Sequence, residues 1–330
     1  MAQMKYFYEL TISSSPHVHS PVTTQTIMRD VLIALAPAMA MSVYFFGFRT
    51  LTVTAVSVAS CVFFEWLYCK MTGVHCKIYD LSACVTGVLL AFVCPVTIPY
   101  WTVILGDFFA IVIVKMLFGG IGKNFVNPAL AGRAFMFSWP VLMTAWTKVG
   151  FENSVSVFKA DAVSCATPLF EMSQGTMPSL RALFFGNVAG CIGETSVLLL
   201  LVGFVYLLAR RVITARIPLS YILTVAVITF LFPGKGQNGA VWMLSQLFSG
   251  GLMLGAIFMA TDYVTSPLTH KGQIIYGIGC GVITVMIRYF GSYPEGVSYA
   301  ILVMNTCVVL LDRLGRPTKF GAPKKEAAKK

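Results

Sequence analysis

An apolar run that stops at two prolines, Pro95 and Pro99, occupies residues 87–99 and reads GVLLAFVCPVTIP. Such a run predicts a helix, and each proline removes a backbone hydrogen bond that a helix needs. Inside a bilayer no water replaces that bond, so a broken helix is tolerated only where protein, a ligand or a wet cavity satisfies the freed groups. The run therefore predicts a helix that breaks beside a cavity or a bound ligand.

A second run, GLMLGAIFMATDYVTSP at residues 251–267, resembles the first. Each is followed at a similar distance by another matching segment, VNPALAGRAFMF at 126–137 and YPEGVSYAILVM at 293–304. If each half of the chain holds five spans, the halves must be inverted relative to each other, as in many transporters. A chance likeness between apolar segments remains the alternative.

The composition indicates a membrane protein. Of the 330 residues 57% are hydrophobic and 11% are charged, whereas soluble domains carry roughly 25% charged residues. Apolar runs of about spanning length predict ten transmembrane helices. They lie near 31–47, 51–69, 80–94, 100–118, 128–146, 191–209, 216–232, 241–260, 273–289 and 296–311. The predicted fold class is an all-α polytopic membrane protein with broken helices.

The formal charge of +11 is better explained by membrane topology than by nucleic acid, because the cations occupy short connectors and the C-terminal tail. With both termini in the cytoplasm, 18 of the 24 lysines and arginines fall on the inner side, as the positive-inside rule requires. The predicted location is the cell (inner) membrane. The predicted regions are a cytoplasmic lead-in (1–30), a five-helix repeat (31–146), an extracytoplasmic loop (147–190), a second repeat (191–312) and a basic cytoplasmic tail (313–330).

The long loop contains DAVSCATPLF, residues 161–170. It resembles D-x-x-S/T-G/S-A-T/S, the pattern at which a flavin transferase attaches FMN to a threonine through its phosphate. The matching residues are Asp161, Ser164, Cys165, Ala166 and Thr167, with Cys165 where the pattern has glycine or serine. Since Pro168 disfavours helical geometry at the residue before it, an exposed Thr167 hydroxyl is expected. An ordinary serine- and threonine-rich turn is the alternative.

Two longer stretches, GGIGKNFVNPALAGRAF at 119–135 and MATDYVTSPLTHKGQ at 259–273, extend the resemblance. From about residue 25 to 315 the chain is similar to one family of membrane subunits. That family comprises the D subunit of Rnf electron-transport complexes and the B subunit of the sodium-translocating NADH:quinone reductase. The short lead-in and the Pro-Leu after Thr167 favour the Rnf branch.

That resemblance implies two inverted five-helix repeats, like those of urea transporters, and FMN joined to Thr167 by a phosphoester. Riboflavin is a candidate second flavin. The implied function is electron relay inside a complex that couples electron transfer from ferredoxin to NAD⁺ to export of Na⁺ or H⁺. Implied partners are the other subunits and the transferase, and the flavin ring is expected near the repeat interface.

Three acidic residues, Asp107, Asp262 and Glu295, fall at or inside predicted spans. Intramembrane ionisable groups mark ion or cofactor paths in many membrane proteins, and a structural role, capping or hydrogen bonding a broken backbone, is the favoured alternative for each. Asp107 is too far from Lys115 for an ion pair and needs another partner or a water-filled cavity. Nine cysteines without two-residue spacing and four scattered histidines predict no metal site.

No side chain stands out as catalytic. A urea-transporter-like solute channel without a redox cofactor is the alternative function, and it leaves the residues around Thr167 unexplained. A purely scaffolding membrane protein explains neither those residues nor the repeat.

Overall fold

The computed structural model describes residues 22–73, 78–147, 165–194, 196–234, 236–291 and 295–315, and these form helices and connecting turns without a strand. The helices are α1 (Thr24–Phe46), α2 (Arg49–Thr72), η1 (Ile78–Asp80), α3 (Ser82–Phe92), α4 (Tyr100–Phe108), η2 (Phe109–Met116), α5 (Pro128–Met136), α6 (Pro140–Met143), α7 (Pro168–Ser173), α8 (Leu180–Phe185), η4 (Ile192–Glu194), α9 (Val197–Ala209), α10 (Arg216–Leu231), α11 (Gly239–Phe248), α12 (Leu252–Leu254), η5 (Gly255–Met259), α13 (His270–Phe290) and α14 (Val297–Leu314).

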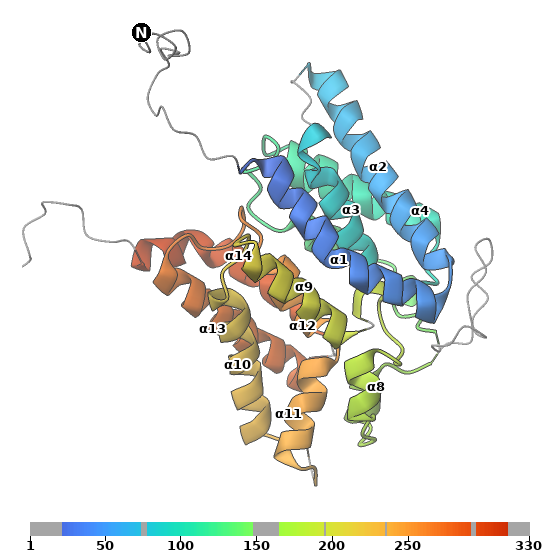
Figure 1. The fold of residues 1–330 in the computed structure, drawn as a ribbon, viewed down its shortest axis with the longest axis vertical. Coiled ribbons are helices and arrows are strands. Elements are labelled where there is room, and N and C mark those ends of the chain that lie inside the picture. Colours follow the sequence, from blue (N-terminus) through green and yellow to red (C-terminus); the bar gives the residue numbers. More distant parts are fainter. Residues whose placement is uncertain are drawn as a thin grey trace, which may run out of the picture.

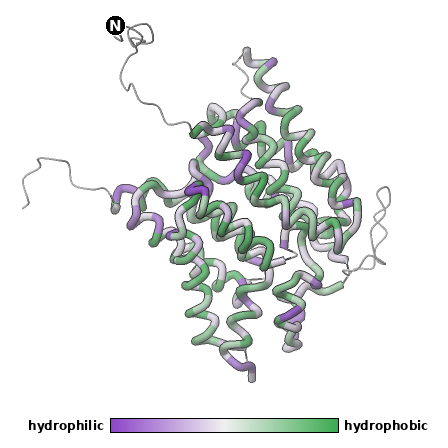
Figure 2. Tube along the Cα trace, viewed as in Figure 1, coloured by the Kyte–Doolittle hydropathy of each residue, from purple (hydrophilic) through white to green (hydrophobic). Residues whose placement is uncertain are grey.

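The predicted apolar runs all coincide with helices. Within the described residues, α1, α2, α13 and α14 are long and apolar enough to cross a membrane, and a fifth candidate is α11 with Leu252–Met259, bent by 63°. The helices α3, α9 and α10 are apolar but shorter. Figure 2 shows hydrophobic residues along most of the helical length, with hydrophilic residues gathered mainly at helix ends and connectors.

Prolines place the breaks in the first half as predicted. The helix α3 ends at Phe92, and α4 begins after Pro99, which is its extended N-cap. At the start of α5 the Asn127 side chain accepts hydrogen bonds from the backbone N–H groups of Ala129 and Leu130. Pro128 occupies the first helical position, where its missing N–H costs nothing.

Glycines make the break between α11 and α12. Gly250 and Gly251 have φ values of 68° and 64°, in the left-handed region that glycine adopts without steric cost. A Cβ atom on Gly250 would lie 2.2 Å from the Leu169 side chain, and one on Gly251 would lie 2.6 Å from Glu194 Oε1. The break therefore lets α7 and η4 approach the backbone closely.

The two halves of the chain pack in matching ways. The helix α2 packs against α3 and α4, while α10 packs against α11 and α13. Figure 1 shows these groups on opposite sides, with α1 and α9 side by side between them. A Cβ on Gly203 of α9 would lie 2.5 Å from the Ala34 carbonyl oxygen of α1, so these helices meet backbone to backbone. The helix α5 of the first half also packs against α14 of the second half.

Candidate functional site

Thr167 lines a pocket, which we call the Thr167 pocket. Its other lining residues come from α5, from the segment that follows α6 and from the start of α14: Arg133, Phe137, Thr144, Trp146, Glu295, Gly296, Ser298 and Tyr299. The pocket thus lies where the segments 126–137 and 293–304 pack together. It joins Thr167 to Glu295, two residues that the sequence singled out separately.

Thr167 is the N-cap of α7. Its φ and ψ of −77° and 154° are extended, as the following proline predicts, and its Oγ1 accepts a hydrogen bond from Phe170 N at 3.3 Å. The residue is only 9% exposed, so the expectation of an exposed hydroxyl is wrong. The cause is that Leu169 and Met172 of α7 pack against Trp242, which holds the turn against the helices.

The rest of the predicted attachment motif is only partly described. Ala166 is exposed, Cys165 is half-buried, and Cys165 N donates to Trp146 O at 2.9 Å. That bond ties the motif to the wall of the Thr167 pocket. Asp161 and Ser164 lie outside the described residues.

Arg133 forms the polar wall of the pocket. Its guanidinium is buried, donates to Ser298 Oγ at 2.6 Å, and forms an ion pair with Glu295. It also contacts Cys191 Sγ at 3.6 Å and lies over the Phe137 ring, 5.5 Å from its centroid. Arg133 Nε is buried without a hydrogen-bond partner, so one strong donor has no acceptor within the described residues.

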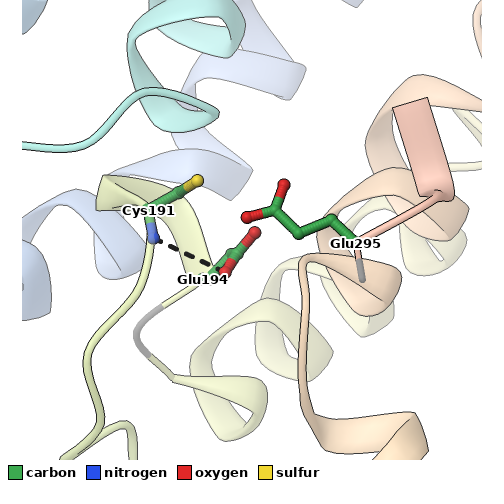
Figure 3. A group of neighbouring side chains, drawn as sticks. All are labelled: Cys191, Glu194 and Glu295. Carbon is green, nitrogen blue, oxygen red and sulfur yellow. Dashed lines mark hydrogen bonds between the residues drawn. The ribbon is translucent and has the colours of Figure 1, made fainter. Parts of the chain in front are cut away.

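A second carboxylate lies beside this ion pair. Figure 3 shows the Glu194 and Glu295 carboxylates turned toward one another, and their oxygens and Cys191 Sγ all lie within 4.8 Å. Cys191 N donates to Glu194 Oε2 at 3.5 Å. Such a trio has metal-ligand chemistry, but Arg133 already bonds to two of its members and supplies the compensating positive charge. The arrangement is a buried charge cluster around an arginine.

Sequence reasoning missed three members of this cluster, Arg133, Cys191 and Glu194. The signal for Arg133 was its place inside a predicted span, where a cation needs an acidic partner. Cys191 and Glu194 read as the beginning of an apolar run, and only the fold brings them to α5.

Asp262 lies in a different pocket, the Asp262 pocket, between α1, α3, the start of α5 and the end of η5. Thr265 Oγ1 donates to Asp262 Oδ2 at 3.0 Å. Burial raises the pKa of Asp262, and the hydrogen bonds from Thr265 and from the N–H groups of Val264 and Tyr263 act in the opposite direction. Asp262 thus braces the turn after η5 and also faces a cavity.

Asp107 lies in neither pocket and is fully buried between α2 and α4. Ser57, Ser60 and Cys61 contact its carboxyl group. Lys115 pairs with Glu65 at 2.8 Å instead. The expectation that Asp107 needs a partner other than Lys115 is confirmed.

Comparison of the sequence with models of known protein families identifies the family of this chain. The model of the NQR2, RnfD, RnfE family matches residues 11–321, nearly the whole chain. The chain belongs to that family. The match includes both predicted repeats, the loop with Thr167 and all three acidic residues.

Members of the family from three bacteria are similar over almost their full length. The D subunit of the Na⁺-translocating ferredoxin:NAD⁺ oxidoreductase complex of Acetobacterium woodii is 47% identical over 321 residues, which cover 96% of each chain. The D subunit of the proton-translocating ferredoxin:NAD⁺ oxidoreductase complex of Clostridium ljungdahlii is 42% identical, covering 94% of this chain and 96% of that protein. The D subunit of the ion-translocating oxidoreductase complex of Actinobacillus succinogenes is 34% identical, covering 94% and 97%.

Proposed function

We propose that this chain is the membrane flavoprotein subunit of an Rnf-type complex, with FMN joined to Thr167 by a phosphoester. The observation that carries this proposal is that Thr167 lines a pocket together with an arginine and three aromatic residues, Phe137, Trp146 and Tyr299. Aromatic rings suit the faces of a flat flavin ring, since they stack on other π-systems. A bound FMN would supply the chemistry that accepts electrons and passes them on.

The residues present fit such a group. Arg133 Nε is a buried donor without a partner, and a buried unpaired donor is costly unless an acceptor reaches it. A phosphate or a ring carbonyl of a flavin offers such an acceptor. Arg133 and Ser298 would then orient the group, and the aromatic residues would exclude water from it.

Attachment of FMN to Thr167 requires a nucleophilic substitution at phosphorus. A bond forms between Thr167 Oγ1 and the FMN phosphorus of FAD, the pyrophosphate bond breaks, and AMP leaves while the hydroxyl proton passes to a base. We propose that the flavin transferase supplies that reaction at the segment holding Asp161, Ser164, Cys165 and Ala166. Cys165 then serves as a small spacer.

The architecture proposed for this function has ten membrane crossings in two inverted five-helix repeats, at 31–146 and 191–312. The matching packing of the two halves supports it, because α2 and α10 occupy equivalent places in chain order and contact equivalent neighbours. The lead-in at 1–30 and the tail at 313–330 are proposed as cytoplasmic. The loop at 147–190, with its flavin, is proposed to lie outside the cytoplasm.

We further propose that a second, non-covalent flavin, riboflavin, occupies the Asp262 pocket. That pocket is the larger of the two and is mainly apolar, with Lys115, Asn124 and Asn127 among its polar residues. The short helix α5 contributes to both pockets, through Ala129 to one and through Arg133 to the other. Arg133 follows Ala129 by four residues, which is a rise of about 6 Å along the helix.

In the complex, this subunit is proposed to relay electrons during ferredoxin:NAD⁺ electron transfer coupled to cation translocation. Two relatives carry that activity in their names, one with Na⁺ and one with protons. The other subunits are its partners, and it is not proposed to act as an independent enzyme. A solute channel of urea-transporter type would not need a flavin on Thr167.

The test is in-gel flavin fluorescence of the purified chain after denaturing electrophoresis, expressed in cells that contain the transferase. Wild type and Thr167→Ser are expected to fluoresce, and Thr167→Ala is expected to be dark because it lacks the attacking oxygen. Thr144→Ala is the matched control, since Thr144 lines the same pocket. A dark wild-type band, or a fluorescent Thr167→Ala band, would refute covalent attachment at this residue.

The second flavin has its own measurement. Flavin extracted from native Thr167→Ala protein and separated by chromatography should be riboflavin. Protein without extractable flavin would refute the second site and leave the covalent one intact.

A further inference from the structure

The Asp107 carboxyl group is buried among small polar side chains of α2. Ser57 Oγ lies 2.8 Å from Asp107 Oδ1, and Cys61 Sγ lies 3.2 Å from the same oxygen. Ser60 Oγ contacts the other oxygen, Oδ2. Asp107, Ser57 and Cys61 are fully inaccessible to solvent, so neither bulk water nor a surface counterion can neutralise a charge here.

Charged groups on the neighbouring elements are engaged elsewhere. On η2, Lys115 donates to Glu65 Oε2 at 2.8 Å and to Ser82 Oγ at 2.7 Å. On α5, Arg133 pairs with Glu295. Within the described part of the chain, no lysine or arginine forms an ion pair with Asp107.

The remaining titratable groups close to this region carry no positive charge. They include the thiols of Cys61 on α2, Cys84 on α3 and Cys94 after α3, and the carboxyl group of Glu65 on α2. An isolated carboxylate inside an apolar bundle is very costly and takes up a proton instead. Neutralisation must therefore come from a proton or from a small bound cation.

The packing favours the proton. The serine and thiol groups contact the carboxyl oxygens directly, and a metal cation between them would push these atoms beyond hydrogen-bond distance. Each serine also reaches a carbonyl oxygen, with Ser57 Oγ at 2.9 Å from Gly87 O and Ser60 Oγ at 3.0 Å from Ser57 O. A proton on Asp107 Oδ2 can be donated to Ser60 Oγ, which then keeps its own proton for the Ser57 carbonyl.

We propose that Asp107 is a proton-binding site, holding a proton on its carboxyl group in the folded protein. Ser57 and Cys61 donate to Oδ1, and Asp107 itself donates to Ser60. This proposal deepens the proposed function, because a complex that translocates cations needs groups that hold the transported charge. The role of Asp107 in translocation rests on the proposed function, whereas its protonation does not.

A polar face of α2 connects the site to a cavity. Ser57, Cys61 and Glu65 follow at intervals of four residues, which places them on one side of the helix. Glu65 pairs with Lys115, and Lys115 lines the Asp262 pocket. These buried polar side chains lie between Asp107 and that pocket.

The test is infrared spectroscopy of the full chain in detergent, with aspartate labelled by carbon-13. A protonated carboxylic acid has a C=O stretching band that a carboxylate lacks. We expect a labelled band in wild type that is lost in Asp107→Asn, whose amide reproduces the same hydrogen bonds. Ser60→Ala should shift the band to higher frequency, because the acid then donates to no hydroxyl group.

Each outcome decides the proposal. A wild-type spectrum without the band, or a band that disappears when NaCl replaces KCl, would overturn it in favour of a carboxylate or a sodium site. A spectrum in which Asp107→Asn removes none of the wild-type bands, or in which Ser60→Ala shifts none of them, would overturn the assignment to this residue. Thr167→Ala should keep the band, so a failure of flavin attachment leaves this result unaffected.

Discussion

The protein buries acidic groups in two different ways. Glu295 lies in the Thr167 pocket against Arg133, and Glu65 lies against Lys115, so each has a cation within ion-pair distance. Among the residues that the structure describes, the partners of Asp107 are two hydroxyl groups and a thiol. Glu65 and Asp107 are both buried, so the difference between them lies in the partner. A carboxylate with a cation can keep its charge, whereas one with neutral donors keeps a proton.

The largest expected effect comes from Arg133→Met. Removing one partner of a buried ion pair leaves the other charge uncompensated and costs about 3–5 kcal/mol. Here two carboxylates, Glu194 and Glu295, lose their cation. Denaturant unfolding in detergent should show this loss. The exposed Arg181→Met is the matched control, and an equal effect in both variants would show that Arg133 is not needed to balance the cluster.

A smaller effect is expected from Ser57→Ala, which removes one donor to Asp107. If the acid is neutral, the free energy of unfolding should fall by about 0.5–1.5 kcal/mol, and if it is charged by about 1.5–3 kcal/mol. The same unfolding experiment, repeated in the Asp107→Asn background, separates the two cases. A loss above about 2 kcal/mol in wild type that vanishes in that background would contradict a protonated Asp107.

The smallest effect is expected from Arg210→Ala. Arg210 Nε lies 3.2 Å from Asp30 Oδ2, but the arginine side chain is 53% exposed. Such pairs contribute about 0–1 kcal/mol. Tyr206 OH also donates to Asp30 at 3.2 Å and partly replaces the lost partner. An unfolding change as large as that of Arg133→Met would contradict the rule that burial decides the cost.

Local patterns predicted much of this fold. Pro99, the N-cap of α4, and Pro128, at the first position of α5, mark helix starts because proline suits the start of a helix. Apolar runs located the helices for a similar reason, since lipid or protein must cover each face. The break at Gly250 and Gly251 was not predicted, because two glycines inside an apolar run do not by themselves indicate a bend.

The candidate site was less predictable. The sequence selected Thr167 and Glu295 separately, and only the packing of α5 on α14 places them in one pocket. Glu194 was missed because its role depends on η4 reaching the break near Gly251. Burial of Thr167 was missed for the same reason, since Trp242 of a distant helix holds α7 in place.

That burial has a consequence for how the protein is made. A transferase cannot reach a threonine that is 9% exposed while Leu169 and Met172 hold α7 against Trp242. Under the proposed function, the cofactor must be added to a nascent or partly assembled chain, before α7 docks. Maturation then has a fixed order, and chains that close too early would accumulate as an unmodified, permanently dark population.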